Sequence, residues 1–422
     1  MTVLNDFRLQ LGEDEYVPIL IGGMGVDIST AELALEACRL GGIGHISDAM
    51  TPFVSDRKFK THFTKTKSGR FKFNRDNQDK TQIKFNLEEL YNATLKVVSA
   101  AVERKQGDGG LFINVMEKLT MGAAADTLGT RLKAAMDAGI DGITLSAGLH
   151  NGTLKLIKDH PRFREVKIGI IVSSVRALKI FVRSAIKLDR LPDYAIVEGP
   201  MAGGHLGFGE DWADYDLNKI VPEVLDYVDE EKLDIKVIPA GGVFTGTDAV
   251  EYMEMGCGAV QVATRFTVTK ECGLPEDVKQ RYFGAIEEDI VVNSLSATGY
   301  LMRMLKYSPA IGANIKPQCE PLGYTLSSKG TCLYVDAYFK TGVDEKGKKL
   351  PVEDKVCICY HFGQHNVWTC GQNCYRLKDT SNQLPDGSYQ MLTAEHVFND
   401  YLYSDNHEIK MPPLPQPEAA EA

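Results

Sequence analysis

The chain has 422 residues, of which 44% are hydrophobic and 25% charged, and its formal net charge is −10. This composition is typical of a globular protein with a sizeable core, and the acidic balance disfavours a nucleic-acid-binding protein. No run approaches about 18 uninterrupted apolar residues, so no membrane span is expected, and the polar N-terminus lacks the pattern of a secretory signal. A cytoplasmic location is the default expectation for such a chain.

Short apolar runs alternate with longer amphipathic runs from Val17 to about Phe283. The apolar runs read as buried parallel strands and are Val17–Ile21, Gly42–Ile46, Leu111–Val115, Gly142–Leu145, Lys167–Val172, Tyr194–Val197, Ile235–Pro239 and Ala259–Val262. The helical patterns between them are Thr30–Leu40 (with Ser29 as its expected N-cap), Leu87–Glu103, Ala123–Ala138, Thr153–Lys158, Ser174–Lys187, Leu217–Val228, Thr247–Met255 and Pro275–Ile286. Eight strand–helix pairs over roughly 250 residues predict an α/β fold of the (β/α)8 or TIM-barrel type rather than a doubly wound sheet.

An insertion, Thr51–Lys84, interrupts the repeat after the second strand. From Pro52 to Lys84 it holds ten Lys or Arg against three Asp, with phenylalanines between them. Loops that follow barrel strands lie at the C-terminal rim, where barrel active sites lie. Two interpretations stay open, a solvated insertion or a lid that attracts an anionic substrate or nucleotide.

The region after the repeat divides into an extension and a tail. We predict a barrel over residues 1–312, an extension over 313–410 packed near the barrel mouth, and a disordered tail over 411–422, which is rich in proline and alanine. Six of the nine cysteines lie between Cys319 and Cys374. Their spacing does not match common metal motifs, so packed thiols are favoured over a zinc or iron–sulfur site and no metal ligand is predicted. The stretch Lys355–Tyr360 reads as a strand with Cys357 and Cys359 on one face.

Three glycine-rich loops follow predicted strands. Strand one ends in Gly22-Gly23-Met24, where glycines let the backbone approach a flat ligand closely. Strand six is followed by Glu198–Gly207, in which His205 comes after two glycines and is the candidate general base. Strands seven and eight are followed by Gly241-Gly242 and Ala263-Thr264, whose amides are expected to cradle a phosphate. A phosphate there and a glycine platform on strand one suit a flavin mononucleotide (FMN) across the barrel mouth.

These motifs together resemble the nitronate monooxygenase family, formerly called 2-nitropropane dioxygenase, which includes the FMN-dependent enoyl-ACP reductases. The most specific match is Ala202–Gly207. The resemblance spans about residues 15–312, including Ser296–Tyr300 and Arg303. A weaker similarity extends over Thr369–Arg376. The resemblance implies that Gly22, Gly23 and Met24 line the flavin ring. It further implies that Asn114 reaches the polar edge of the ring, Gly148 floors the substrate side, Gly203 contacts the cofactor and His205 is the base. The phosphate would be held by Gly241, Gly242, Ala263 and Thr264.

The activity that the resemblance implies is oxidation of an alkyl nitronate with dioxygen through a flavin semiquinone. The alternative enzyme is an NAD(P)H-dependent flavin reductase acting on an enoyl thioester or a quinone, which the basic insertion favours because such substrates are anionic. A third hypothesis is an FMN-holding subunit of a larger assembly without turnover of its own, against which the intact His205 argues. The expected partners are a small-molecule substrate and dioxygen, with neither nucleic acid nor membrane. The oligomeric state stays open, with a homodimer among the options.

Overall fold

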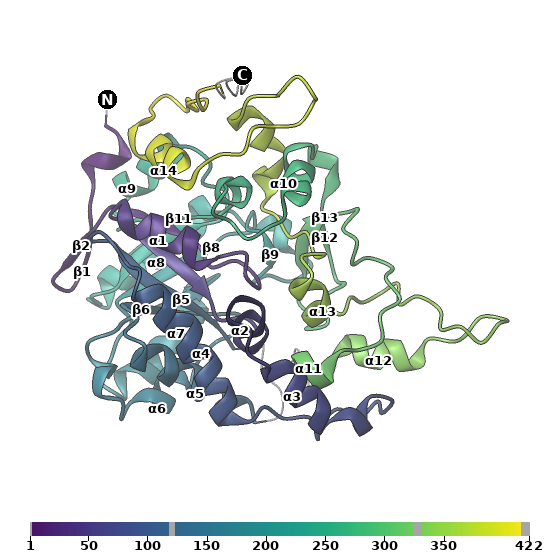
Figure 1. The fold of residues 1–422 in the computed structure, drawn as a ribbon. Coiled ribbons are helices and arrows are strands. Elements are labelled where there is room, and N and C mark those ends of the chain that lie inside the picture. The colour runs from purple at the N-terminus through teal and green to yellow at the C-terminus, as the bar shows by residue number, and fades with distance from the viewer. Residues whose placement is uncertain (1, 118–122, 324–330, 415–422) are drawn as a thin grey trace, which may run out of the picture.

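The computed structural model describes residues 2–117, 123–323 and 331–414 (Figure 1). Eight parallel strands close into a barrel in the order β10-β11-β3-β4-β5-β6-β7-β8. They are β3 (Ile19–Ile21), β4 (Ile43–Ser47), β5 (Gly110–Met116), β6 (Gly142–Ser146), β7 (Lys167–Val172), β8 (Tyr194–Glu198), β10 (Lys236–Ala240) and β11 (Val260–Val262). Each strand coincides with one of the eight predicted apolar runs, so the predicted barrel is confirmed.

Helices alternate with these strands as the amphipathic patterns predict. They are α1 (Ala31–Arg39), α4 (Leu87–Val102), α5 (Ala124–Asp137), α6 (Thr153–Ile157), α7 (Val175–Ile186), α8 (Leu217–Glu230), α9 (Gly246–Glu254) and α10 (Glu276–Phe283). The predicted N-cap of α1 is wrong by one residue, because the Thr30 side chain accepts the hydrogen bond from the Leu33 N–H. Ser29 instead donates to the Gly22 carbonyl (3.1 Å) and accepts from the Met24 N–H (2.7 Å), which fixes the loop after β3.

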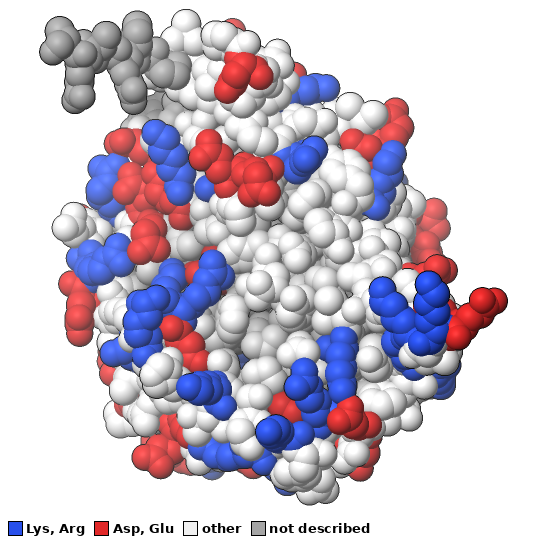
Figure 2. Space-filling model, turned by 45° about the vertical axis from the view of Figure 1, so that its right-hand side comes forward, with Lys and Arg blue, Asp and Glu red and all other residues white. Residues whose placement is uncertain are grey.

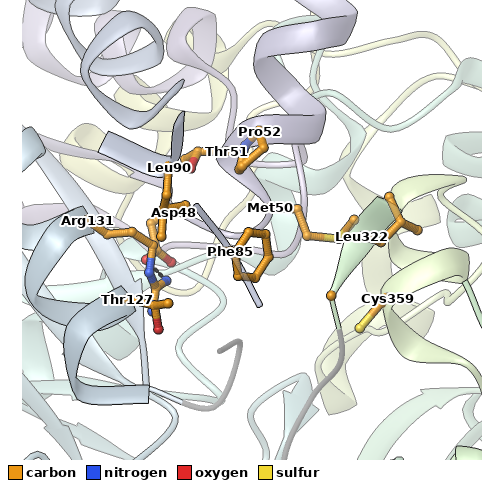
Figure 3. A pocket seen from close by; sticks show the side chains of 11 residues that line it. Asp48, Met50, Thr51, Pro52, Phe85, Leu90, Thr127, Arg131, Leu322 and Cys359 are labelled. Atoms are coloured by element: carbon orange, nitrogen blue, oxygen red, sulfur yellow. Dashed lines mark hydrogen bonds and ion pairs between the residues drawn. The ribbon is translucent and has the colours of Figure 1, made fainter. Parts of the chain in front are cut away.

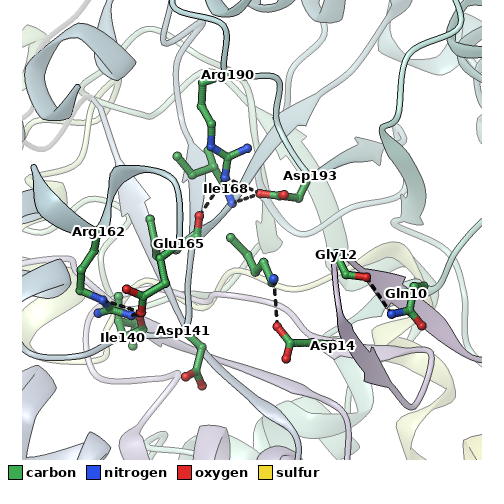
Figure 4. Close-up of polar contacts among 12 residues, drawn as sticks. Gln10, Gly12, Asp14, Ile140, Asp141, Arg162, Glu165, Ile168, Arg190 and Asp193 are labelled. Carbon is green, nitrogen blue, oxygen red and sulfur yellow. Dashed lines mark hydrogen bonds and ion pairs between the residues drawn. The ribbon is translucent and has the colours of Figure 1, made fainter. Parts of the chain in front are cut away.

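The lower end of the barrel, at the N-terminal ends of the strands, is closed by a hairpin of β1 (Leu9–Leu11) and β2 (Asp14–Tyr16). Leu9, Leu11 and Tyr16 are buried against the inward-facing side chains of the barrel, among them Phe112. Polar groups at this end are paired with one another, as Figure 4 shows. Lys167 Nζ lies 2.9 Å from Asp14 Oδ2, and Asp193 Oδ2 accepts from the Ile168 N–H (2.6 Å) and from Arg190 (2.7 Å).

The insertion after β4 folds into α2 (Thr51–Phe59), α3 (Phe63–Arg70) and a 3₁₀ helix, η2 (Lys72–Asn74). It packs against α11 (Cys319–Leu322) of the extension. Lys67 is buried and donates to the carbonyls of Cys319 (2.9 Å) and Glu320 (2.8 Å), and Lys80 forms a buried ion pair with Glu320 (2.8 Å). Two of the basic residues therefore hold the extension in place, while most of the others are exposed.

The chain after α10 packs on the barrel in more than one place. Near the upper end, a three-stranded antiparallel sheet has the order β12-β13-β9 and consists of β12 (Ile290–Asn293), β13 (Met302–Leu305) and β9 (Gly204–His205). On the outside, α14 (Ala394–Tyr403) lies beside both α1 and α9, at the top of Figure 1. The boundary placed at residue 312 stays a prediction, as does disorder of the 411–422 tail, of which residues 415–422 lie outside the described ranges.

The remaining elements are short. They are the helices α12 (Leu333–Lys340) and α13 (Ile358–Gly363) and the 3₁₀ helices η1 (Leu4–Asp6), η3 (Pro161–Phe163), η4 (Trp212–Asp214), η5 (Thr264–Val268), η6 (Glu287–Asp289) and η7 (Gln372–Thr380). The predicted strand Lys355–Tyr360 is wrong, because the chain turns into α13 after Cys357, whose carbonyl accepts the His361 N–H at 3.0 Å. Alternating β-branched residues were the signal for a strand there, and the tertiary context overrode this local preference. Within the described ranges, no helix is long and apolar enough to cross a lipid bilayer.

Candidate active site

The predicted site residues all lie at the upper end of the barrel, where the C-terminal ends of the strands meet. A first group lies where β3 and β5 end. A Cβ atom on Gly23 would lie 2.3 Å from Asn114 Cβ, so only glycine fits there, and the Asn114 amide donates weakly to the Gly23 carbonyl (3.4 Å). Gly22 and Met24 are held by Ser29 as described above. The structure therefore brings together the residues expected to line a flat ring.

Three polar side chains point into the upper end of the barrel without a matching partner. Asn114 Oδ1 and Gln261 Oε1 are buried and accept no hydrogen bond among the described residues. Glu198 ends β8, two residues after the inward-facing Ile196, and burial raises the pKa of its carboxyl group to about 7. Buried acceptors without donors are costly, so this arrangement suits a ligand that brings its own donor groups.

The loops after β10 and β11 form a second group. Gly241 and Gly242 have positive φ angles of 89° and 114°, which favour glycine, and a Cβ on Gly241 would lie 2.9 Å from the Ala202 nitrogen. Among the described residues, the N–H groups of Gly241, Gly242, Val243, Ala263 and Thr264 donate no hydrogen bond. Backbone N–H groups are rarely left unpaired in a folded protein, and a cluster of them at loop turns is a typical anion site.

His205 lies in β9, opposite Met302 of β13. Its Nε2 is 2.6 Å from Ser296 Oγ, and Ser296 Oγ is 2.6 Å from Thr298 Oγ1. Among the described residues Nδ1 has no hydrogen-bond partner, so it is the nitrogen available to a ligand. Burial away from water lowers the pKa of His205 to about 4, because it disfavours the charged imidazolium. The imidazole is therefore unprotonated at pH 7.

Gly148 and Gly203 are sites of close approach. A Cβ on Gly148 would overlap the Glu117 carboxylate, at 1.7 Å from its Oε2, and one on Gly203 would lie 2.5 Å from the Cys370 carbonyl carbon. Every predicted site residue thus lies at this end of the barrel. Gly203 is in close contact with Cys370 of the C-terminal extension. Glu198, Gln261 and the Thr369–Arg376 segment were missed as site residues. Strand alternation was the signal that could have found Glu198, because it places Glu198 on the same face of β8 as the inward-facing Tyr194 and Ile196.

A buried ion pair lies beside the start of α2. Figure 3 shows the Asp48 and Arg131 side chains pointing at one another, and Arg131 also donates to the Met116 carbonyl (2.9 Å). Burial raises the pKa of Asp48 to about 6, against the opposing effect of Arg131. The cavity beside this pair has a volume of about 20 Å3, room for about one water molecule, so it is not a substrate pocket.

The cysteine cluster does not form an evident metal centre. In the parts of the chain that the structure describes, no group of three or more His, Cys, Asp or Glu side chains is placed to hold a metal ion. None of the nine cysteines is in a disulfide. The predicted shared face of Cys357 and Cys359 depended on a strand, and the structure has the helix α13 there instead.

Comparisons with known proteins identify the family. The family model described as nitronate monooxygenase matches residues 13–348, so the chain belongs to the nitronate monooxygenase family of oxidoreductases. A probable nitronate monooxygenase of Staphylococcus saprophyticus is 24% identical over 66% of this chain and 72% of that protein. FabK from Thermotoga maritima matches in structure with a TM-score of 0.54 and 18% identity over 95% of each chain. The predicted resemblance is confirmed.

One relative carries a different activity in its name. A (3aS,4S,5R,7aS)-5-hydroxy-7a-methyl-1-oxo-octahydro-1H-indene-4-carboxyl-CoA dehydrogenase of Rhodococcus jostii is 33% identical, over 24% of this chain and 26% of that protein. The chain therefore matches about a quarter of the length of that relative.

Proposed function

We propose that this protein is an FMN-dependent nitronate monooxygenase that oxidises alkyl nitronates with dioxygen. The observation that carries the proposal is the juxtaposition, at one end of a barrel, of five unpaired backbone N–H groups, two unpaired buried amide oxygens and a neutral histidine. An FMN molecule has a phosphate for the first group and a ring edge with an N–H donor for the second. The residues present therefore fit this cofactor.

In this proposal the ring lies against Gly22, Gly23 and Met24, with Asn114 at its polar edge. Gly148 lies on the substrate side, and Gly203 contacts the cofactor. The phosphate is held by the N–H groups of Gly241, Gly242, Ala263 and Thr264. Bound FMN supplies the electron transfer between the nitronate and dioxygen. The glycines contribute by leaving the space for the ring, because a Cβ atom at Gly23 would clash with Asn114.

His205 is the residue that moves a proton. When the substrate is a neutral nitroalkane, Nδ1 accepts the proton of the carbon next to the nitro group, because Nε2 is engaged by Ser296. Ser296 and Thr298 hold the imidazole orientation through their hydroxyl chain. The lowered pKa keeps the ring unprotonated at pH 7 before a substrate binds.

An alternative substrate class is an anionic acyl thioester, reduced with NAD(P)H as co-substrate. Figure 2 shows Lys and Arg gathered on the lower part of the face, below a hollowed and largely uncharged centre. Lys60, Lys65 and Lys72 of the insertion are exposed, and none of them forms an ion pair among the described residues. Such cations would attract an acyl carrier or coenzyme A.

Anaerobic absorption spectra of the FMN-loaded protein separate the two. Propionate 3-nitronate, NADH and NADPH are added separately. A change in the flavin spectrum with nitronate alone is expected. Reduction by NADH or NADPH, with no response to nitronate, would overturn the proposal in favour of the reductase.

The role of His205 is tested by His205→Asn, with His396→Asn on α14 as the matched control. Because general bases contribute about 10²–10⁴-fold, turnover of a nitroalkane should fall by at least about 100-fold while FMN stays bound. The control should keep its turnover. Unimpaired turnover in His205→Asn would refute the role of a base.

A further inference from the structure

The segment Thr369–Arg376, called the C-terminal strap here, crosses the upper end of the barrel beside the predicted phosphate loops. Thr369 forms an isolated β-bridge with Met304 of β13. The Gln372 N–H donates to the Met201 carbonyl at 3.0 Å, which joins the strap to the loop after β8. A piece of chain more than 100 residues beyond the last barrel strand is thus in contact with the site.

Two glycines allow the strap to approach so closely. A Cβ atom on Gly371 would lie 2.6 Å from Thr264 Oγ1, and one on Gly203 would lie 2.5 Å from the Cys370 carbonyl carbon. Gly371 has an ordinary φ angle of −72°, so its backbone conformation suits any residue. Space alone therefore requires glycine at this position.

Asn373 orients the loop after β10. Its side chain is buried, and Nδ2 donates to the Gly242 carbonyl at 2.8 Å. In a trans peptide the carbonyl and the N–H point in opposite directions. Because Asn373 holds the Gly242 carbonyl on the strap side, the Val243 N–H of the same peptide points away from the strap, where it meets no acceptor among the described residues.

The strap also brings a positive charge to this corner. The Arg376 guanidinium lies 4.3 Å from the ring centre of Phe244, the residue that follows Val243. Arg265 is nearby but forms a buried ion pair with Asp400 (2.6 Å). No ion pair of Arg376 occurs among the described residues, so its charge is available to an anion.

We propose that the C-terminal strap supports the phosphate site from its outer side. Asn373 sets the direction of the Gly242–Val243 peptide, and Gly371 leaves room for Thr264. The inference rests on the proposed FMN site and extends it: the region beyond residue 312 belongs to the cofactor-binding machinery. It predicts that affinity for the phosphate-bearing flavin depends on a residue far from the barrel in sequence.

The test measures dissociation constants of FMN and of riboflavin, which lacks the phosphate, by flavin fluorescence with the full-length chain after removal of bound flavin. Asn373→Ala should weaken FMN binding about tenfold, the loss expected for one hydrogen bond, and leave riboflavin binding unchanged. Asn382→Ala is the matched control, because Asn382 Nδ2 also donates to a backbone carbonyl, that of Pro412, at 2.8 Å.

Three outcomes are informative. If the unaltered chain binds no FMN, the proposed function fails. If it binds FMN and Asn373→Ala binds it equally well, or if riboflavin binding weakens as much as FMN binding, the strap proposal is overturned while the proposed function stands. Should Asn373→Ala not fold, Gly371→Ala is the second variant. Its backbone is unstrained, and it should likewise weaken FMN and spare riboflavin, so equal affinity there overturns the proposal too.

Discussion

The two ends of the barrel are built from the same eight strands but differ in how their polar groups are satisfied. At the lower end, Asp193 accepts two hydrogen bonds and Lys167 pairs with Asp14 under a hairpin that plugs the interior (Figure 4). At the upper end, five backbone N–H groups and two buried amide oxygens have no partner among the described residues. The polar groups of the lower end are satisfied within the protein, whereas the upper end keeps donors and acceptors unpaired, as the proposed flavin site requires.

The largest expected effect is at the plug of the lower end. Tyr16→Ala removes a buried ring that meets Phe112 edge-on, with ring centres 6.4 Å apart. The free energy of unfolding, measured by urea denaturation, should fall by about 3–5 kcal/mol. FMN affinity of the folded fraction should not change, because the ring is at the opposite end of the barrel. A selective loss of FMN binding with normal stability would contradict a purely structural role of the lower end.

A smaller loss is expected from Asp193→Ala, which removes the acceptor of the Ile168 N–H and of Arg190. Hydrogen bonds to a charged group contribute about 1.5–3 kcal/mol, and the free energy of unfolding should fall by that amount. Asp234→Ala is the matched control, since Asp234 is exposed and forms a surface ion pair with Lys236, and its effect should stay below about 1 kcal/mol. Equal effects of the two variants would contradict the assignment of the lower end.

Glu198 supplies the corresponding test for the upper end. Its folded-state pKa of about 7 exceeds the unfolded value of about 4.3, so between these pH values the folded protein keeps a proton that the unfolded chain releases. The stability of the flavin-free protein should therefore fall as pH rises from about 4.5 to 7. The loss is about 1–2 kcal/mol for a side chain that keeps some exposure.

Glu198→Gln should remove this fall, and urea denaturation across the pH range measures it. Glu223→Gln, on the exposed side of α8, should keep the slope of the unaltered protein. An unchanged slope in Glu198→Gln would mean that the carboxyl group is not held in its neutral form.

The smallest expected effect concerns the orientation of His205. Ser296→Ala removes the hydroxyl that lies 2.6 Å from Nε2, and turnover of a nitroalkane should fall about tenfold, corresponding to about 1.4 kcal/mol. A positioning role also shifts the acid limb of the pH–rate profile, whereas a purely structural defect lowers the rate equally at every pH. Ser296→Thr should restore much of the activity.

The sequence predicted the barrel and most of the site for reasons that are local. Apolar runs such as Lys167–Val172 are bounded by polar residues, and glycines such as Gly23 and Gly241 mark places where a side chain would clash or φ is positive. The strap could not be predicted in its place, because Asn373 meets Gly242 through a contact 131 residues apart along the chain. The helix α13 was missed because its alternating pattern matched a strand, and packing decided otherwise.

The flavin site is tested most directly by comparing unfolding of the protein with FMN and with riboflavin. One FMN should bind per chain, and the free energy of unfolding should rise with FMN concentration, by about 2.7 kcal/mol at 100 times the dissociation constant. At equal concentration riboflavin should stabilise much less, since it leaves the N–H groups of Gly241, Gly242 and Thr264 unpaired. No stabilisation by FMN, or equal stabilisation by both flavins, would contradict the assignment of the upper end as a flavin phosphate site.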